Sequence, residues 1–377
     1  MYIRLRHNNI YKKYKKIVSM AVSGGIDSSI TAWLLKKQGY KVFGIFMKNW
    51  NNKYNCPSKK DLIDSINISI ILDISLKIIN FIEEYKYIVF NEFLREYSIG
   101  RTPNPDIFCN SNIKFRFFLK YSLSIKSNYI ATGHYARIRK KLCFFNLKLY
   151  ELIKGIDNKK DQSYFLHRLN QSQLSKSLFP IGNFNKTNIR KIANKLNFLN
   201  KDKKDSMGIC FIGKFSFKNF INHYFPLKVG KILNSEKIFL GKHKGLFFYT
   251  IGQRRGLIKS KIKNNKKFLL QKFNKIYIIN KNIKKNTLYV EQGSYNEFLL
   301  IENILINNIH FISKVYPLKI LFSAKNRYKK IDSKIKLIRL DKRKFLLKFI
   351  SKQICFSPGQ SLVFYNINVC IGGGIII

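Results

Sequence analysis

Acidic residues are scarce in this sequence. Only 20 Asp and Glu stand against 71 Lys and Arg, which gives a formal net charge of +51 at pH 7. An excess of this size implies a polyanionic partner, most simply nucleic acid. Lys, Asn, Ile, Phe and Tyr are all abundant while Ala and Pro are scarce, a bias that mutational drift in an AT-rich genome also produces. The charge therefore supports an RNA partner without establishing one.

Cysteine pairs and long apolar runs are also missing. The six cysteines lie far apart and none forms a CxxC pair, which disfavours zinc ribbons, iron–sulfur clusters and a secreted disulfide framework. No apolar run reaches the roughly 18 to 20 residues of a membrane span. The first 16 residues are basic and contain no acid, as in a transit peptide, but they run directly into the first predicted strand. We therefore expect a cytoplasmic protein with a basic N-terminal arm and no membrane partner.

The most informative stretch that is present is Ile17–Ser29, IVSMAVSGGIDSS. A short apolar strand meets a Ser-Gly-Gly turn and then a helix start, where free backbone N–H groups and the helix dipole attract anions. Gly24 and Gly25 let the backbone approach a phosphate closely, and Asp27 is a candidate Mg²⁺ ligand. The alternative is an ordinary strand–helix turn. The Walker A pattern is absent, and SGGxDS instead looks like the pyrophosphate loop of the ATP pyrophosphatases.

Strands and helices alternate through the first half of the chain. The apolar patterns predict strands at Ile17–Val22, Tyr40–Met47, Leu76–Phe81 and Tyr129–Thr132, and helices at Ser28–Lys37, Asp61–Leu72, Phe90–Ile99 and Asn185–Asn197. This order predicts an α/β domain with a doubly wound parallel sheet, similar to a Rossmann fold, with ligands at the carboxyl ends of the strands. Met47 and Gly133 follow such strand ends, beside the glycine turn.

Two cysteines lie in distinctive surroundings. Two prolines in the segment TPNP fix an extended stretch, and Asp106 then opens a helix whose first turn contains Cys109. A thiol at a helix N-terminus has a lowered pKa, although a buried core cysteine is an equally good interpretation. Cys210 follows Lys203 and Lys204, which favour a thiolate, but its apolar neighbours Ile209 and Phe211 indicate burial.

The second half of the chain is β-rich. Short strands are predicted at 231–233, 245–250, 275–279 and 287–290, and from Leu299 onward the pattern is typical of a small barrel. We expect a flexible loop at Lys259–Lys267. The predicted domains are a catalytic domain at 1–217, a central β-rich domain at 218–286 and a C-terminal β-barrel at 287–377.

Taken together, a series of motifs resembles the tRNA-specific 2-thiouridylases, which place sulfur on C2 of the wobble uridine. The motifs are AVSGGIDSS (21–29), GIFMKNW (44–50), GRTPNPDIFCN (100–110), IATGHYAR (130–137), KDQSYFL (160–166), KKDSMGICFIG (203–213), GL..YTIGQRRGL (245–257) and SPGQSLVFYN with CIGGG (357–374). They span nearly the whole chain. Other pyrophosphate-loop enzymes share only the first.

The resemblance implies a role for each matched residue. ATP, with Mg²⁺, would be bound by Ala21, Val22, Ser23, Gly24, Gly25, Ile26, Asp27, Ser28, Met47 and Gly133. Contacts to tRNA would come from Asn104, Pro105, Asp106, Lys160, Asp161, Gln162, Arg327 and Tyr328, the first three at the target base. Cys210 would carry a persulfide, Cys109 would be its catalytic partner, and Asp106 would act as acid or base.

The implied reaction joins these residues. Adenylation of the uracil 2-oxo group, with loss of pyrophosphate, makes that oxygen a good leaving group, and the persulfide sulfur on Cys210 then attacks C2. Cys109 would release the sulfur through a disulfide or as hydrosulfide. The implied partners are tRNA of the Lys, Glu or Gln class and a persulfide donor, either a cysteine desulfurase or a relay protein. The alternatives are an ATP-dependent ligase or synthetase with the same loop and a non-catalytic basic RNA-binding protein.

Overall fold

The structure is a computed structural model. It describes residues 2–3, 16–51, 57–142, 148–205, 210–211, 217–254, 257, 275–313, 322–326, 333–341, 343–354 and 356–377. Arg327, Tyr328 and the predicted loop at 259–267 lie outside these ranges. Along the described chain, no helix combines the length and apolar character that a membrane crossing requires.

A mainly parallel sheet forms the first domain. Its strand order is β1-β4-β3-β2-β5-β8, and the bounds are Tyr2–Ile3, Leu76–Asn80, Lys41–Lys48, Ile17–Val22, Tyr129–Ala131 and Ser177–Leu178 in that order. Strand β1 pairs antiparallel with β4, and the other pairings are parallel. Five of the six residues of β2 are buried, as expected of a strand covered on both faces. The doubly wound sheet that the sequence predicts is therefore confirmed.

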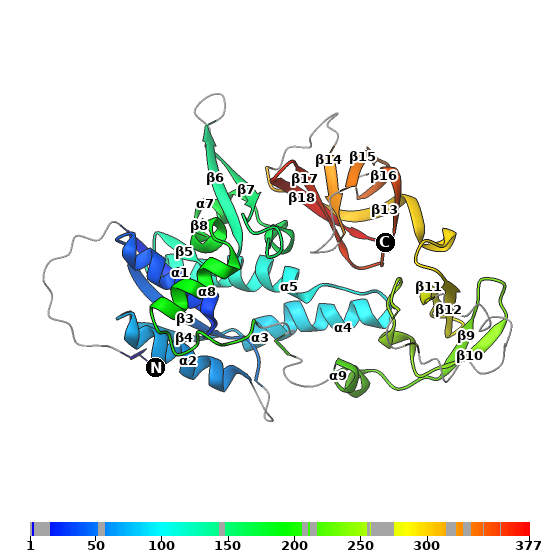
Figure 1. The fold of residues 1–377 in the computed structure, drawn as a ribbon, viewed down its shortest axis with the longest axis horizontal. Coiled ribbons are helices and arrows are strands. Elements are labelled where there is room, and N and C mark those ends of the chain that lie inside the picture. Colours follow the sequence, from blue (N-terminus) through cyan, green and yellow to red (C-terminus); the bar gives the residue numbers. More distant parts are fainter. Residues whose placement is uncertain are drawn as a thin grey trace, which may run out of the picture.

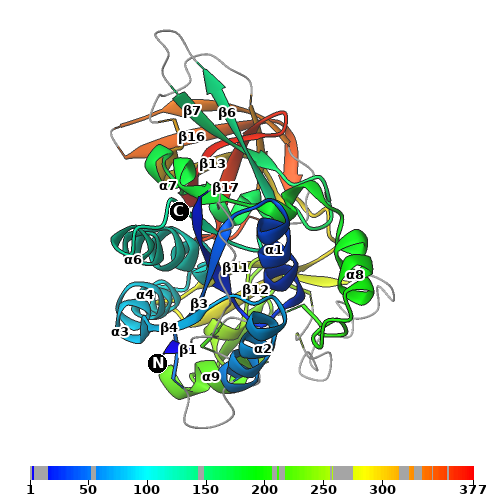
Figure 2. The same ribbon diagram turned by 90° about the vertical axis from the view of Figure 1, so that its left-hand side faces the viewer.

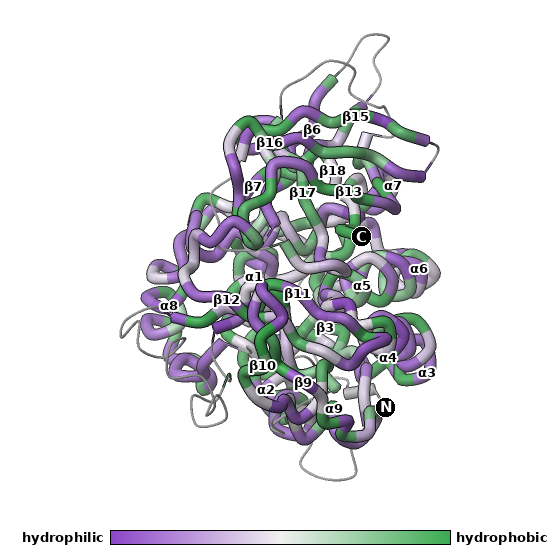
Figure 3. Tube along the Cα trace, turned by 90° about the vertical axis from the view of Figure 1, so that its right-hand side faces the viewer, coloured by the Kyte–Doolittle hydropathy of each residue, from purple (hydrophilic) through white to green (hydrophobic). Residues whose placement is uncertain are grey.

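Helices cover both faces of this sheet, with α1, α2 and α8 on one side and α3, α4 and α6 on the other (Figure 2). The bounds are α1 Ile26–Lys37, α2 Pro57–Ile71, α3 Ile82–Tyr85, α4 Asn91–Ser98, α5 Pro105–Phe108, α6 Leu119–Ser124, α7 Gln171–Ser175, α8 Lys186–Lys195 and α9 Phe217–Tyr224. Two π-helices, η1 (Lys86–Phe90) and η2 (Cys109–Phe118), continue α3 and α5 without a break. In Figure 3 the covering helices carry hydrophilic and hydrophobic stretches side by side, the pattern of a helix with one buried face.

The central domain is a four-stranded sheet of order β10-β9-β12-β11. These strands span Phe239–His243, Gly230–Leu233, Thr287–Gln292 and Ile276–Asn282, in the same order. Strand β12 pairs with both β11 and β9, so it belongs to this sheet, whereas the sequence-based boundary at 286/287 assigns it to the barrel. The predicted strand at 245–250 is wrong. Its middle forms the 3-10 helix η6 (Leu246–Phe248), because the Phe247 ring stacks on Phe225 at 4.6 Å and this packing outweighs the β propensity.

The C-terminal domain is a closed antiparallel barrel of order β13-β16-β15-β14-β17-β18, in which β13 also pairs with β18. The strands span Leu300–Phe311, Lys344–Ile354, Ser333–Arg339, Phe322–Lys325, Ser361–Asn366 and Val369–Ile376, in the same order. A two-stranded ribbon follows β5 and consists of β6 (Ala136–Leu142) and β7 (Lys148–Lys154), and its strand β7 pairs with β18. The barrel is therefore joined to the first domain by strand pairing as well as by the chain (Figure 1).

All three domains meet at the segment that precedes Asn104. The Thr102 amide donates to the Pro358 carbonyl at 2.8 Å, and the Thr102 and Thr250 hydroxyls lie 3.5 Å apart. Gly359 has a φ of +88°, and a Cβ there would lie 2.8 Å from the Arg101 Cβ and 3.0 Å from the Thr102 nitrogen. The barrel loop thus rests directly on the backbone that leads into the Asn104–Asp106 segment.

Replacing Gly359 tests this close approach. We expect Gly359→Ala to lower the melting temperature more than Gly293→Ala does. Gly293 has a similar φ of +85°, but a Cβ there would meet nothing within 4 Å, so it isolates the backbone strain of roughly 1 kcal/mol. The extra loss at Gly359 then measures the steric contact between barrel and catalytic domain. Equal shifts in the two variants, measured by calorimetry, would contradict a tight junction.

Candidate active site

The glycine turn has the shape of an anion site. Strand β2 ends at Val22, α1 begins at Ile26, and Gly24 between them has a φ of +68°. A Cβ on Gly24 would lie 2.4 Å from the Asp61 carbonyl oxygen of α2, so only glycine fits. The Ser28 hydroxyl donates to the Gly25 carbonyl at 2.8 Å and accepts from the Ser23 amide at 3.3 Å. The turn is therefore held open at the helix N-terminus by its own side chains.

Met47 and Gly133 lie at the same edge of the sheet. Met47 is the last residue but one of β3, and Gly133 follows β5. A Cβ on Gly133 would lie 3.0 Å from the Ser28 nitrogen, so this glycine packs directly against the start of α1. The predicted phosphate-loop residues and these two positions are thus brought together at the carboxyl ends of the strands.

Asp27 is already neutralised by protein groups. Its carboxylate accepts from the Lys186 Nζ at 2.8 and 2.9 Å and from the Tyr135 hydroxyl at 2.7 Å. Both carboxylate oxygens are therefore engaged, and a Mg²⁺ ion on Asp27 would have to displace Lys186. Within the described residues, no three His, Cys, Asp or Glu side chains are grouped as a metal site requires. These contacts do not fit a metal ion resident on Asp27.

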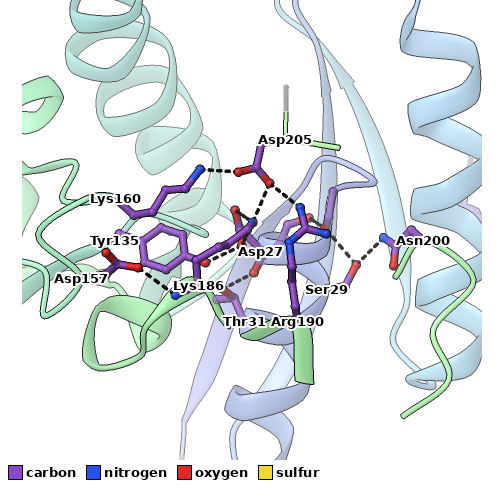
Figure 4. A network of polar contacts seen from close by, with 12 residues as sticks. Asp27, Ser29, Thr31, Tyr135, Asp157, Lys160, Lys186, Arg190, Asn200 and Asp205 are labelled. Carbon is purple, nitrogen blue, oxygen red and sulfur yellow. Dashed lines mark hydrogen bonds and ion pairs between the residues drawn. The ribbon is translucent and has the colours of Figure 1, made fainter. Parts of the chain in front are cut away.

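Lys186 also joins Asp27 to Asp205, as Figure 4 shows. Its Nζ lies 2.7 Å from the Asp205 carboxylate, which also pairs with Lys160 and, at 3.5 Å, with Arg190. Burial alone would raise the pKa of Asp205, but the hydrogen bonds from Lys160 and Lys186 outweigh it and the pKa is lowered. Asp205 is thus held as a carboxylate, five residues before Cys210.

Two further contacts fasten this segment to the phosphate loop. The Asn200 amide donates to the Gly24 carbonyl and to the Ser29 hydroxyl, both at 3.0 Å. Lys203 donates to the Gly24 carbonyl at 3.1 Å and pairs with Asp61 at 2.7 Å and with Asp64 on α2. Neither Lys186 nor Asn200 was predicted from the sequence. The signal for Lys186 is its spacing of four residues from Arg190 along α8, which lets both side chains reach one partner.

Cys109 and Cys210 lie in one cluster with Asp106 and Lys114. The Cys109 thiol interacts electrostatically with Lys114, Cys210 and Asp106, and the Cys210 thiol interacts with Lys114 and Asp106. Cys109 is buried at 5% exposure, Cys210 is exposed, and both are free thiols. Trp50, two residues beyond β3, packs against Phe211 at 5.8 Å. The cluster therefore lies toward the same carboxyl edge of the sheet as the phosphate loop.

The expected lowering of the Cys109 pKa is wrong. The helix begins at Pro105, so Cys109 is its fifth residue and its amide is not one of the free N–H groups at the N-terminus. Burial raises the pKa of Cys109 to about 12, and the charge of Lys114 opposes the rise only in part. The Cys210 residue keeps an exposed surface, but the protein around its sulfur displaces water and raises its pKa, against Lys114. Lys203, expected to favour a Cys210 thiolate, is instead paired with Asp61 and Asp64.

Asp106 has the environment of an acid–base group. The residue keeps an exposed surface, but the protein around its carboxyl raises its pKa, with Lys114 opposing. Its own amide donates to the Asn104 side chain at 3.1 Å, which caps α5, and Pro105 is the buried first helical residue. The Asn104–Asp106 segment is therefore rigid, and the Asp106 carboxyl lies near the two thiols.

The predicted KDQ residues all make contacts within the protein. Lys160 pairs with Asp205. Asp161 is 2% exposed and accepts from the Gly155 amide at 3.0 Å, and Gln162 accepts from the Tyr135 amide at 3.0 Å. Their contacts to tRNA stay a prediction, as do those of Arg327 and Tyr328 outside the described residues.

A cavity of about 450 Å³ lies elsewhere, between the end of α1, the β6–β7 ribbon and β8. Its lining includes Arg137, Arg139 and Asn183 and contains none of the predicted site residues. The candidate site is therefore the edge formed by the glycine turn and the cysteine cluster, not this cavity.

The cysteine environment leads to a measurable order of reactivity. With iodoacetamide at pH 8, we expect Cys210 to be alkylated at least about tenfold faster than Cys109, because the Cys210 residue reaches the surface and Cys109 does not. The thiolate is the nucleophile in both cases. Lys114→Gln removes the cation that lowers both thiol pKa values, so both rates fall further. Lys120→Gln, an exposed position on α6, is the control. Peptide-resolved mass spectrometry measures the rates, and unchanged rates in Lys114→Gln would rule out this influence.

Comparison with known proteins gives consistent matches along the whole chain. Residues 15–214 match the model described as tRNA methyl transferase HUP domain, residues 218–292 its PRC-barrel domain, and residues 301–376 an aminomethyltransferase β-barrel domain. The "tRNA-specific 2-thiouridylase MnmA" of Bordetella avium is 45% identical over 98% of this chain and 99% of its own length. The protein of the same name from Janthinobacterium is 44% identical over 96% and 98%.

A third relative with this name, from Bordetella parapertussis, is 43% identical over 98% of this chain and 100% of its own length. Among solved structures, a 4-thiouridine synthetase–RNA complex with bound ATP aligns with a TM-score of 0.36 and 15% identity, covering 53% of this chain and 46% of that one. A likeness this distant adds nothing to the near full-length matches.

Proposed function

This chain belongs to the family of tRNA-specific 2-thiouridylases, and on that premise we propose that it catalyses the ATP-dependent 2-thiolation of the wobble uridine of tRNA. The observation that carries the proposal is the grouping of two free thiols and the Asp106 carboxyl at the sheet edge that holds the glycine turn. A ligase or synthetase of the same superfamily needs the turn but has no use for paired thiols.

The first step is activation of the uracil by ATP. The turn from Ala21 to Ser28, with Met47 and Gly133, holds the phosphates, and the 2-oxo oxygen attacks the α-phosphorus so that pyrophosphate leaves. Three cations, Lys186, Lys160 and Arg190, lie beside this turn. They stabilise the negative charge that develops on the phosphates as pyrophosphate leaves. Lys186 occupies both oxygens of the Asp27 carboxylate, so Asp27 acts here as the partner of that lysine and not as a Mg²⁺ ligand.

The second step is sulfur transfer. A persulfide on Cys210 attacks C2 with its terminal sulfur, and AMP leaves with the former 2-oxo oxygen. The Cys109 thiolate then attacks the Cys210 sulfur; a Cys109–Cys210 disulfide forms, the bond to the transferred sulfur breaks, and its electron pair completes 2-thiouridine. The raised pKa of Asp106 suits it to hold a proton and exchange it with the uracil ring or with Cys109.

The partners follow from the same chemistry. The net charge of +51 attracts the tRNA backbone, with Asn104, Pro105 and Asp106 at the target base and Lys160, Asp161, Gln162, Arg327 and Tyr328 contacting the tRNA elsewhere. The acceptors are tRNAs of the Lys, Glu or Gln class. The exposed Cys210 is accessible to a persulfide donor, a cysteine desulfurase or relay protein. Such a reaction belongs in the reducing cytoplasm, where the disulfide is transient.

Thiolation of tRNA in vitro tests the proposal. With ATP, wobble-uridine tRNA and a persulfide donor, we expect 2-thiouridine from the wild type and a loss of at least about a hundredfold in Cys210→Ser and Cys109→Ser, because each removes a nucleophile. Cys370→Ala, which removes a buried thiol in β18, is the control and keeps activity. Nucleoside mass analysis gives the readout. Full activity in Cys210→Ser would refute the proposed mechanism.

The role of Lys186 at the phosphates is separately testable. In Lys186→Gln, Asp27 loses the cation that neutralises it, while Asp205 keeps Lys160 and Arg190, so ATP meets the uncompensated carboxylate of Asp27. We expect ATP affinity, measured by calorimetry without tRNA, to fall at least about tenfold, or 1.4 kcal/mol. Lys191→Gln, an exposed lysine on the same helix, should leave it unchanged. An unaltered affinity in Lys186→Gln would place the phosphates away from this network.

A further inference from the structure

Buried polar groups join the catalytic domain to the start of one barrel strand and the end of its neighbour. Tyr164 lies in the 3-10 helix η4 (Ser163–Leu166) and is buried. Its hydroxyl donates to the Ser361 carbonyl at 2.8 Å and to the Asn326 carbonyl at 3.3 Å. Ser361 is the first residue of β17, and Asn326 directly follows β14, which pairs with β17. One hydroxyl of the catalytic domain therefore holds two adjacent places in the barrel.

A buried ion pair makes the same connection. Lys325 is the last residue of β14, and its ammonium lies 3.8 Å from the Asp161 carboxylate, with side-chain exposures of 8% and 2%. The catalytic domain fixes that carboxylate, which accepts from the amides of Gly155 and Ser163 at 3.0 and 3.1 Å and from the Ser163 hydroxyl at 3.0 Å. Since a buried charge without a partner is costly, the ion pair holds Lys325 against the catalytic domain.

Both contacts lie directly before a predicted tRNA contact. Lys325 and Asn326 are buried, and the next two residues in the sequence are Arg327 and Tyr328. Contacts that fasten Lys325 and Asn326 to the catalytic domain therefore set the point from which the chain continues into Arg327.

We propose that Tyr164 and Lys325 are positioning residues for tRNA binding, which hold the end of β14 against the catalytic domain so that Arg327 and Tyr328 meet a tRNA whose wobble base is at the active site. The proposal rests on the proposed function in its assignment of Arg327 and Tyr328 as tRNA contacts. Tyr164 and Lys325 act through these neighbours, since both side chains are buried.

Positioning affects affinity because the tRNA would contact two domains at once. The Asn104–Asp106 segment belongs to the catalytic domain, whereas Arg327 and Tyr328 belong to the barrel. Contacts on two domains add to affinity only when the domains are arranged so that both can be made. The apparent affinity therefore falls in proportion to the fraction of molecules with that arrangement, and this fraction depends on the Tyr164 hydroxyl and the Lys325 ammonium.

The test measures the affinity of the full-length protein for wobble-uridine tRNA, by fluorescence anisotropy at one salt concentration and without ATP or a persulfide. We expect Tyr164→Phe and Lys325→Met each to raise Kd about fivefold, as the binding arrangement becomes less populated. Tyr365→Phe is the matched control and should leave Kd unchanged, because it deletes a buried hydroxyl of the same junction that contacts Ser163 at 3.1 Å. The affinity for ATP, measured by calorimetry without tRNA, should stay at the wild-type value in all three variants.

A double-mutant cycle separates positioning from general loosening. Arg327→Ala/Tyr328→Ala removes the groups that are positioned, and we expect it to raise Kd at least about tenfold. Adding Tyr164→Phe to this variant should then change Kd by less than about twofold, because nothing is left to position.

A further fivefold loss in that background would overturn the proposal. So would an unchanged Kd in Tyr164→Phe or Lys325→Met, or an equal loss in Tyr365→Phe. Wild-type affinity in Arg327→Ala/Tyr328→Ala would overturn it together with the assignment of those two contacts. Failure of the proposed chemistry would instead appear as thiolation by Cys210→Ser, so the failures can be told apart.

Discussion

The ion pairs of Lys186 hold the two halves of the site together. One ammonium contacts Asp27 at the phosphate loop and Asp205 on the segment that leads to Cys210, and Lys160 and Arg190 complete the charge balance around Asp205. With side-chain exposures of only 10% for Lys186 and 28% for Asp27, loss of Lys186 would leave the partly buried charge of Asp27 unpaired, which is costly. The network therefore fixes the position of Asp205, five residues before Cys210, relative to the phosphate loop.

Hydrophobic packing of Phe211 then fixes the position of its neighbour Cys210. Phe211 inserts among the rings of α3, η1, α4 and α9, and this leaves Cys210 at the surface beside the buried Cys109. Both thiols have raised pKa values because protein displaces water around their sulfurs. The positive charge of Lys114 works in the opposite direction at both thiols. Reactivity at this site is thus a balance between desolvation and a neighbouring cation.

Much of the fold was predictable because its signals are local. The run IVSMAV predicts a strand buried on both faces, and β2 is one; the motif SGGIDS predicts an anion site because the strand end, the glycine turn and the helix start are consecutive. Predictions failed where distant contacts decide. The segment GLFFYT has strong β propensity, but Phe247 stacks on Phe225 and the chain turns into a 3-10 helix. The Cys109 pKa was mispredicted for a similar reason, since burial by distant elements exceeds the effect of a helix terminus.

The sequence by itself determined the doubly wound sheet, the phosphate loop and the family, because these depend on neighbouring residues and on motif order. Only the tertiary structure decided which charges and thiols meet. Lys186 lies 159 positions from Asp27 and Asn200 lies 176 positions from Gly24, so neither contact leaves a local pattern. Electrostatic and hydrogen-bond energies depend on separation in space and on displaced water, and both are fixed only when the chain has folded.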